Sequence, residues 1–162
     1  MHASTLHSLS QQRPALRLRW EALLRDEPVN SPLAHPDSLI HLMDWTLDNF
    51  FAELRHPSTL PDDILVAPRN PHEAAFASPD DAALCPCARN PFIAYFATAE
   101  CALVEILLPL LSADSQAASL ATARAALQRI ARTEISTFCA ICQQRHDDGR
   151  CTAGHAAAGS SR

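Results

Sequence analysis

Six cysteines are the residues of this sequence whose type and spacing suggest chemistry. Cys85 and Cys87 form a pair separated by one proline, and Cys139 and Cys142 form a second pair separated by two residues. Thiolates are soft ligands that bind Zn²⁺ tetrahedrally, with Zn–S distances of about 2.3 Å, or hold an iron–sulfur cluster. The four thiols therefore predict a metal site, provided that the fold brings the two pairs together.

The two pairs meet if the last two long helices form an antiparallel hairpin. A turn near residues 113–114 places residue 85 opposite residue 142, and so brings the first pair beside the second at the far end of the hairpin. Cys139 and Cys142 lie three residues apart, so one helix presents both on one face. We therefore expect Cys85, Cys87, Cys139 and Cys142 to bind Zn²⁺, or alternatively an iron–sulfur cluster, in a structural role or as a sensor of metal or redox state.

The ligand set has alternatives among the residues that follow. His146 lies four residues after Cys142, and Cys151 lies in the tail, so either could replace one of the four thiols. A set made of Cys139, Cys142, His146 and Cys151 is one residue short of the spacing of a zinc knuckle and lacks the glycine and aromatic residues of that motif. It would also require the tail to fold back, so we favour the first set.

Two other hypotheses about function use no metal. In the first, Cys139 and Cys142 form a thiol redox switch or the active pair of an oxidoreductase. In the second, the chain is a helical interaction module. We also expect a protein partner or a homodimer. Cys101 lies far from both pairs, near the middle of the predicted hairpin, and we expect it to be a small buried hydrophobic residue.

Glycine is absent from the first 148 residues, which excludes several classes of fold and function. Gly149, Gly154 and Gly159 all lie in the C-terminal tail. Type I′ hairpins, phosphate-binding loops and dinucleotide-binding folds depend on the positive φ angles that glycine adopts. The HExxH and GxSxG motifs are absent as well, and the one base near a cysteine nucleophile is His146, beside Cys142. We therefore expect no enzymatic activity.

The net charge of −5 argues against binding to nucleic acid, which usually requires a clustered basic face. All 13 basic residues are arginines. The densest basic run consists of Arg13, Arg17 and Arg19, which we interpret as a solvent-exposed face of a helix.

The stretch Phe92–Leu111 is long enough to span a membrane, but Glu100 and Glu105 would each cost about 2–3 kcal/mol or more inside a bilayer. We therefore expect a buried core helix and no membrane contact. A carboxylate on its apolar face needs a partner or a proton, and the hairpin places Arg124 nearest to Glu100. Residues 1–30 show no secretion signal, which predicts a cytoplasmic protein with reduced cysteines.

Apolar residues recur at helical spacing along most of the chain, and 162 residues suffice for one domain with a hydrophobic core. We predict an all-α, single-domain helical bundle of about four main helices, whose last two form the hairpin and whose middle segment is proline-rich and irregular. Residues 1–12 are expected to be a flexible N-terminus, residues 13–146 the helical bundle domain and residues 147–162 a disordered C-terminal tail.

The predicted helices span Pro14–Arg25, Pro36–Arg55, Pro91–Leu111 and about Ser115–His146. The residues expected in the core include Leu16, Trp20, Met43, Trp45, Leu47, Phe50, Phe51, Leu127 and Ile141.

Overall fold

A computed structural model describes residues 1–29, 34–57 and 90–147, the last six as backbone only. The regular structure of these residues is helical, without strands, and this confirms the predicted all-α class. Along the chain the elements are α1 (Ala3–Gln11), α2 (Arg13–Asp26), α3 (Pro36–Leu39), the 3₁₀ turn η2 (Ile40–Leu42), α4 (Met43–Arg55), α6 (Pro91–Leu107), the 3₁₀ turn η6 (Leu108–Leu110) and α7 (Gln116–Asp147).

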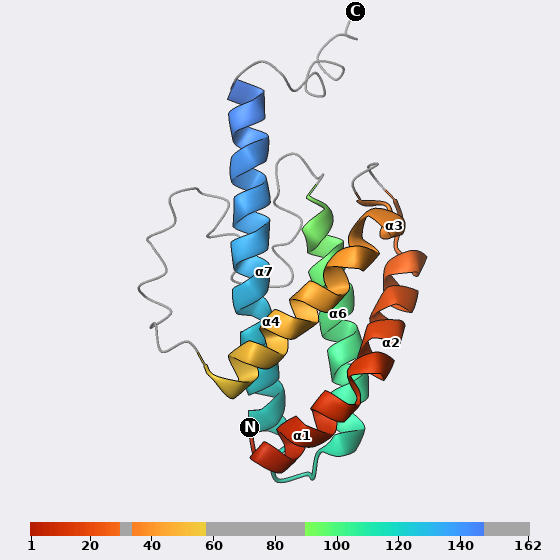
Figure 1. Ribbon diagram of the computed structural model, residues 1–162, viewed down its shortest axis with the longest axis vertical. Coiled ribbons are helices and arrows are strands. Elements are labelled where there is room, and N and C mark those ends of the chain that lie inside the picture. Colours follow the sequence, from red (N-terminus) through yellow and green to blue (C-terminus); the bar gives the residue numbers. More distant parts are fainter. Residues whose placement is uncertain (30–33, 58–89, 148–162) are drawn as a thin grey trace, which may run out of the picture.

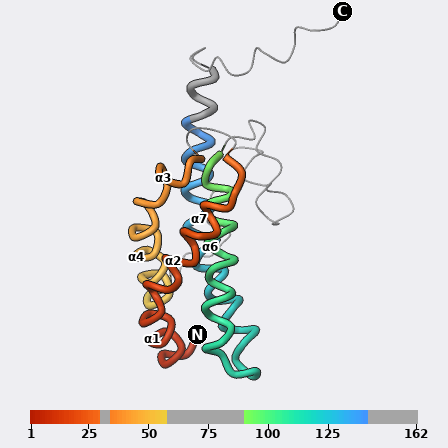
Figure 2. Tube along the Cα trace, turned by 90° about the vertical axis from the view of Figure 1, so that its right-hand side faces the viewer, coloured from red at the N-terminus to blue at the C-terminus, as the bar shows by residue number. Residues whose placement is uncertain are grey.

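The core forms around α6, which packs against α2 on one side and α7 on the other (Figure 1). α4 crosses α7, and Figure 2 shows α4 on one side of the molecule and α6 with α7 on the other. The largest side chains in the core are Trp20, Tyr95, Phe50 and Phe51, all nearly inaccessible to solvent. Burial of such side chains is the main favourable term in folding.

The region Pro36–Arg55, which was predicted to be one helix, is helical, but the helix is interrupted. A 3₁₀ turn at Ile40–Leu42 separates α3 from α4, so the region has a short first helix and a longer second one. The start at Pro36 is as predicted, because proline suits the first turn of a helix.

The prediction that Trp45 belongs to the core is wrong, because half of its surface is exposed. Met43, Leu47, Phe50 and Leu54 recur at the spacing of one helical face and are buried. Trp45 lies two residues after Met43, about 200° around the helix, and so falls on the solvent side. The large apolar side chain of Trp45 is therefore not sufficient to place it in the core.

The expected flexible N-terminus is instead the helix α1, with Leu9 fully buried. Leu9 packs into the same hydrophobic core as Leu16 and Trp20. Tertiary packing therefore holds a short polar helix that has little stability of its own. The expected C-terminal tail follows α7, and its residues 148–162 lie outside the described part of the chain.

α6 begins and ends at sequence signals that are visible in the chain. The Asn90 side chain accepts a hydrogen bond from the Phe92 N–H, as an N-cap does, and Pro91 occupies the first turn. Pro109 lies in the 3₁₀ turn that ends the helix; it lacks an N–H and so cannot continue the α-helical hydrogen bonds. α7 starts eight residues after Leu108, and its last turns extend past the other described helices in Figure 1.

Pro91–Leu110 is, among the described residues, the one helix long and apolar enough to cross a membrane by length and composition alone, with a mean hydropathy of 1.7. The core helix of a globular protein passes the same test. Here Tyr95, Ala102, Leu103 and Leu107 are buried against neighbouring helices.

Candidate functional site

The start of α6 and the second half of α7 meet at Asn90 and Cys139. The Nδ2 group of Asn90 donates to the Cys139 Sγ at 3.2 Å and to the Ile135 carbonyl at 3.2 Å. The Oδ1 atom of the same side chain accepts from the Phe92 N–H at 3.0 Å. Asn90 is 5% exposed and Cys139 9% exposed. One buried amide therefore ties the first turn of α6 to a sulfur atom on α7.

The contacts between α6 and α7 run in opposite directions along the two helices. Asn90 contacts Cys139, and Glu100, ten residues later, pairs with Arg124 on α7. The Glu100–Arg124 ion pair has an Oε1–Nε distance of 2.9 Å. It is the ion pair predicted from the sequence.

Of the four predicted metal ligands, the structure describes the side chain of Cys139. Cys85 and Cys87 lie outside the described residues, as does the alternative ligand Cys151. Cys142 and His146 belong to α7, but their side chains are outside the described part of the chain. Within that part, no group of three or more histidine, cysteine or acidic side chains is placed to hold a metal ion.

Cys101 was expected to be buried, and this is wrong: its side chain is exposed. Ala97 and Glu105, one turn before and one turn after, are exposed too. These positions share one exposed stripe of α6, and Arg19 of α2 reaches the stripe at Glu105. The neighbouring residue Ala102 is fully buried, so the phase of the helix, and not the residue type, decides the burial of each side chain.

Aromatic rings lie next to the Asn90–Cys139 contact. Phe92, two residues after Asn90, packs edge-to-face against Phe138 on α7, with ring centroids 5.9 Å apart. It also packs edge-to-face against Tyr95, at 5.9 Å. An apolar shell of this kind limits the access of water to a nearby sulfur.

Arginines of α2 pair with carboxylates on other helices, so the predicted solvent-exposed face also contacts α4 and α6. Arg19 donates from Nε and Nη2 to the two oxygens of Glu105 at 2.5 and 3.0 Å. These hydrogen bonds lower the pKa of Glu105 and raise that of Arg19. Arg13 pairs with Asp48 on α4, and this hydrogen bond lowers the pKa of Asp48.

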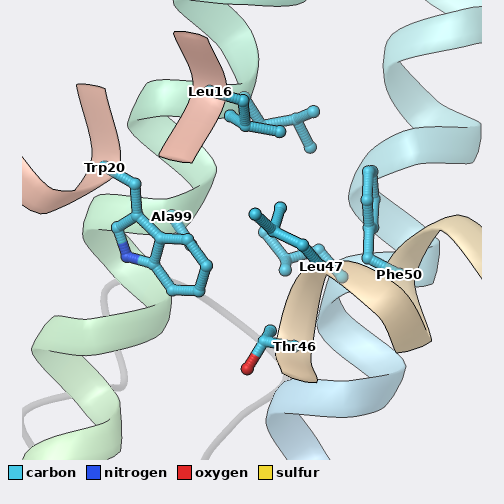
Figure 3. Close-up of a pocket in the computed structure, with 8 residues that line it drawn as sticks. Leu16, Trp20, Thr46, Leu47, Phe50 and Ala99 are labelled. Carbon is cyan, nitrogen blue, oxygen red and sulfur yellow. The ribbon is translucent and has the colours of Figure 1, made fainter. Parts of the chain in front are cut away.

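A void in the described core is too small to hold a small-molecule ligand. Figure 3 shows a void between Leu16, Trp20, Thr46, Leu47, Phe50 and Ala99. Its volume is about 10 Å³, which corresponds to a single water molecule at most. Pockets for ligands of drug size are larger by more than an order of magnitude, so the void is a packing defect in the core.

Comparison with known proteins adds no assignment: no protein-family model, curated protein or solved structure matches this chain. The candidate site is therefore argued from its own residues. Asn90 before Pro91 is a pattern typical of a helix start, but the pattern does not show the bond to Cys139. A cap is visible as a local pattern, whereas the bond to sulfur depends on how two helices pack.

Proposed function

We propose that this chain is a small non-enzymatic metal-binding protein in which Cys85, Cys87, Cys139 and Cys142 hold Zn²⁺, or alternatively an iron–sulfur cluster. Its role is structural or that of a sensor of metal or redox state. The observation that supports this proposal is the hydrogen bond between Asn90 and the sulfur of Cys139. It fixes a residue that closely follows the first cysteine pair against a residue of the second pair.

The covalent chain limits how far the two pairs can be apart. An extended chain spans at most about 3.3–3.6 Å per residue, so residue 87 lies within about 11 Å of residue 90, and residue 85 within about 18 Å. Residue 142 follows Cys139 by three residues of α7, a rise of about 4.5 Å. A tetrahedral site with four thiolates is compatible with these limits.

The surroundings of Cys139 fit a metal ligand better than a reactive thiol. Catalytic and redox-sensing cysteines are partly exposed, whereas Cys139 is buried. Cysteine ligands commonly accept hydrogen bonds from neighbouring N–H groups, and these bonds tune the metal. Asn90 supplies such a donor. The bound ion would supply a link between the proline-rich segment and α7, and loss of the ion would release that link.

The proposal includes a cellular compartment and a partner for this protein. We place the protein in the cytoplasm, where thiols stay reduced and available to a metal, and we assign it a protein partner or a homodimer as the recipient of its signal. Binding to nucleic acid is not proposed because the net charge is −5, and membrane contact is not proposed because α6 carries two carboxylates.

Metal analysis of protein purified without a histidine tag tests the proposal. We expect about one zinc ion per chain, the stoichiometry of a closed four-thiolate site, or the brown colour of an iron–sulfur cluster. Cys87→Ser and Cys142→Ser should each lose the metal. Cys101→Ser is the matched control, because Cys101 is exposed on α6, and it should retain the metal.

Protein that contains neither metal nor cluster, and takes up neither after reconstitution, contradicts the proposal. The rate at which the Cys142 thiol is alkylated then separates the two alternatives. Fast alkylation near neutral pH supports a thiol redox switch that uses Cys139 and Cys142. The slow reaction of an ordinary thiol, with a pKa near ~8.5, leaves the helical interaction module.

A further inference from the structure

We propose that an open hollow between the starts of α1 and α7 binds a phosphate group, either as the free ion or as part of a small molecule. The site is independent of the metal site proposed above, because it uses none of the cysteines. The hollow has a volume of about 690 Å³, and ligand pockets usually measure about 300–1,000 Å³. Figures 1 and 2 show α1 and the start of α7 at the same end of the molecule.

Both helices begin at this hollow with N–H groups that their own carbonyls do not use. In α1 the Leu6 N–H donates to the His2 carbonyl at 3.0 Å. In α7 the Ser119 N–H donates to the Ser115 carbonyl at 3.0 Å. The three N–H groups before each of these bonds have no carbonyl of their own helix to bind. Neither first turn carries an acidic residue. Such N–H groups, at the positive end of the helix dipole, bind phosphate groups well.

Side chains at the two capping positions leave these N–H groups available. The His2 side chain makes no capping hydrogen bond to α1. The Ser115 Oγ lies 2.9 Å from the Ser112 Oγ and donates to the Ser112 carbonyl at 3.3 Å. A capping hydroxyl ordinarily accepts from the second or third N–H of its helix, whereas this one stabilises the preceding turn.

Ser119 is the second observation that points to a ligand. It is 2% exposed, and its side chain makes no hydrogen bond to the described residues. Every described polar side-chain atom that is closed off from solvent has a partner, so the Ser119 hydroxyl opens into the hollow, which Ser119 lines. Alanine at this position would have no hydroxyl to desolvate and a higher helix propensity. A ligand that bonds to the hydroxyl explains why serine is present.

Other residues of the lining add hydrogen-bonding groups. Ser4 and Thr5 contribute hydroxyls from the first turn of α1, and the His2 imidazole offers a donor. Asp114 is the one carboxylate among the described residues that line the hollow. Its charge opposes a phosphate group placed next to it, but its oxygens accept hydrogen bonds from hydroxyl groups elsewhere on a ligand.

Calorimetric titration of the untagged full chain with inorganic phosphate and with glycerol 3-phosphate, at constant ionic strength, tests the site. We expect saturable binding of both. In Ser119→Ala both affinities should fall by about tenfold or more, because a hydrogen bond to a charged group is worth at least about that factor. Ser136→Ala is the matched control, since Ser136 also lies on α7 but does not line the hollow, and it should bind as the unaltered chain does.

Two charge variants give an independent measurement. Ala118 is exposed and lines the hollow. Ala118→Glu places a carboxylate in the first turn of α7, where it stabilises the helix and repels the phosphate group. This variant should lose phosphate binding without a lower Tm. Asp114→Asn should instead bind phosphate more tightly, because it removes a repulsive charge.

The absence of saturable binding overturns the proposal, as does binding that an equal concentration of sodium chloride abolishes. Unchanged affinities in Ser119→Ala overturn it as well, and so does full binding by Ala118→Glu. Tighter binding of glycerol 3-phosphate than of inorganic phosphate supports a phosphorylated small molecule as the ligand. Equal affinities support free phosphate.

Discussion

The buried hydrogen bond between Thr46 and Tyr95 offers a sharp test of the packing between α4 and α6. The two hydroxyl oxygens lie 2.9 Å apart. Thr46 is 1% exposed and Tyr95 fully buried. Tyr95→Phe removes one hydroxyl and leaves the other in the core, and Thr46→Val does the reverse. The double variant replaces both groups by apolar ones of similar shape.

Each single variant should lower the free energy of unfolding by about 1–3 kcal/mol, because a buried hydroxyl that loses its partner bears its full desolvation cost. In the double variant no such hydroxyl remains, and its stability should return close to that of the unaltered chain. Independent effects would instead add to about 2–6 kcal/mol, twice the single value. The double variant is thus predicted to be more stable than the sum of the two single effects would give.

Denaturant unfolding followed by circular dichroism measures these values. For a chain of this size, each 1 kcal/mol corresponds to about 2–4 °C in Tm. Thr46→Ser is the control, since it keeps the hydroxyl and loses a methyl group. A double variant as unstable as the sum of the two single variants would refute the reasoning. Single variants of full stability would refute it as well.

Four further predictions concern individual side chains of the described helices. Burial raises the pKa of Tyr95, the one tyrosine of the chain, above its ordinary value of 10.0. The stability that the neutral phenol contributes is present below pH 10 and is lost as the pH rises, so tyrosinate absorbance and loss of helix should appear together in an alkaline titration. Ionisation of Tyr95 before unfolding would contradict this prediction. Arg19 lowers the pKa of Glu105 below 4.5, so this pair stabilises the fold above that pH and ceases to do so as the carboxylate is protonated; Glu105→Gln should have a lower Tm than the unaltered chain at pH 7, and the difference should vanish in acid. Leu107→Ala should lower the free energy of unfolding by about 2–5 kcal/mol, since Leu107 is fully buried, whereas Leu18→Ala, at a position 65% exposed, should change it little. Iodoacetamide should label exposed Cys101 in the folded protein before buried Cys139, as mass spectrometry of timed samples can show; the reverse order would contradict the described burial.

Much of the fold follows from the periodicity of apolar residues, because a long amphipathic helix has one stable way to hide its apolar face. The positions of α2, α4, α6 and α7 were predictable for this reason. α1 was not, since its helix depends on Leu9 finding a place in the core, and that place exists after the other helices have packed. The spacing of apolar residues predicts each helix separately and does not show how the helices pack together.

Three residues that were predicted to be buried are exposed: Trp45, Cys101 and Ile141. Trp45 and Cys101 lie on the solvent sides of α4 and α6. Ile141 belongs to the C-terminal part of α7, and the last turns of that helix extend past the other described helices (Figure 1). Phase around the helix axis, and the length of the neighbouring helices, outweigh hydrophobicity at these positions.

The predicted site depends on how firmly α6 is held against its neighbours. Among the described residues, Asn90 and Glu100 contact α7, and Glu105 contacts Arg19 on α2. Tyr95 bonds to Trp20 on α2 and to Thr46 on α4. Because these partners belong to three helices, α6 can neither slide nor rotate without breaking at least one contact. The position of residue 90 relative to Cys139 is then a property of the whole bundle. The chain therefore enters α6 at a residue that contacts Cys139.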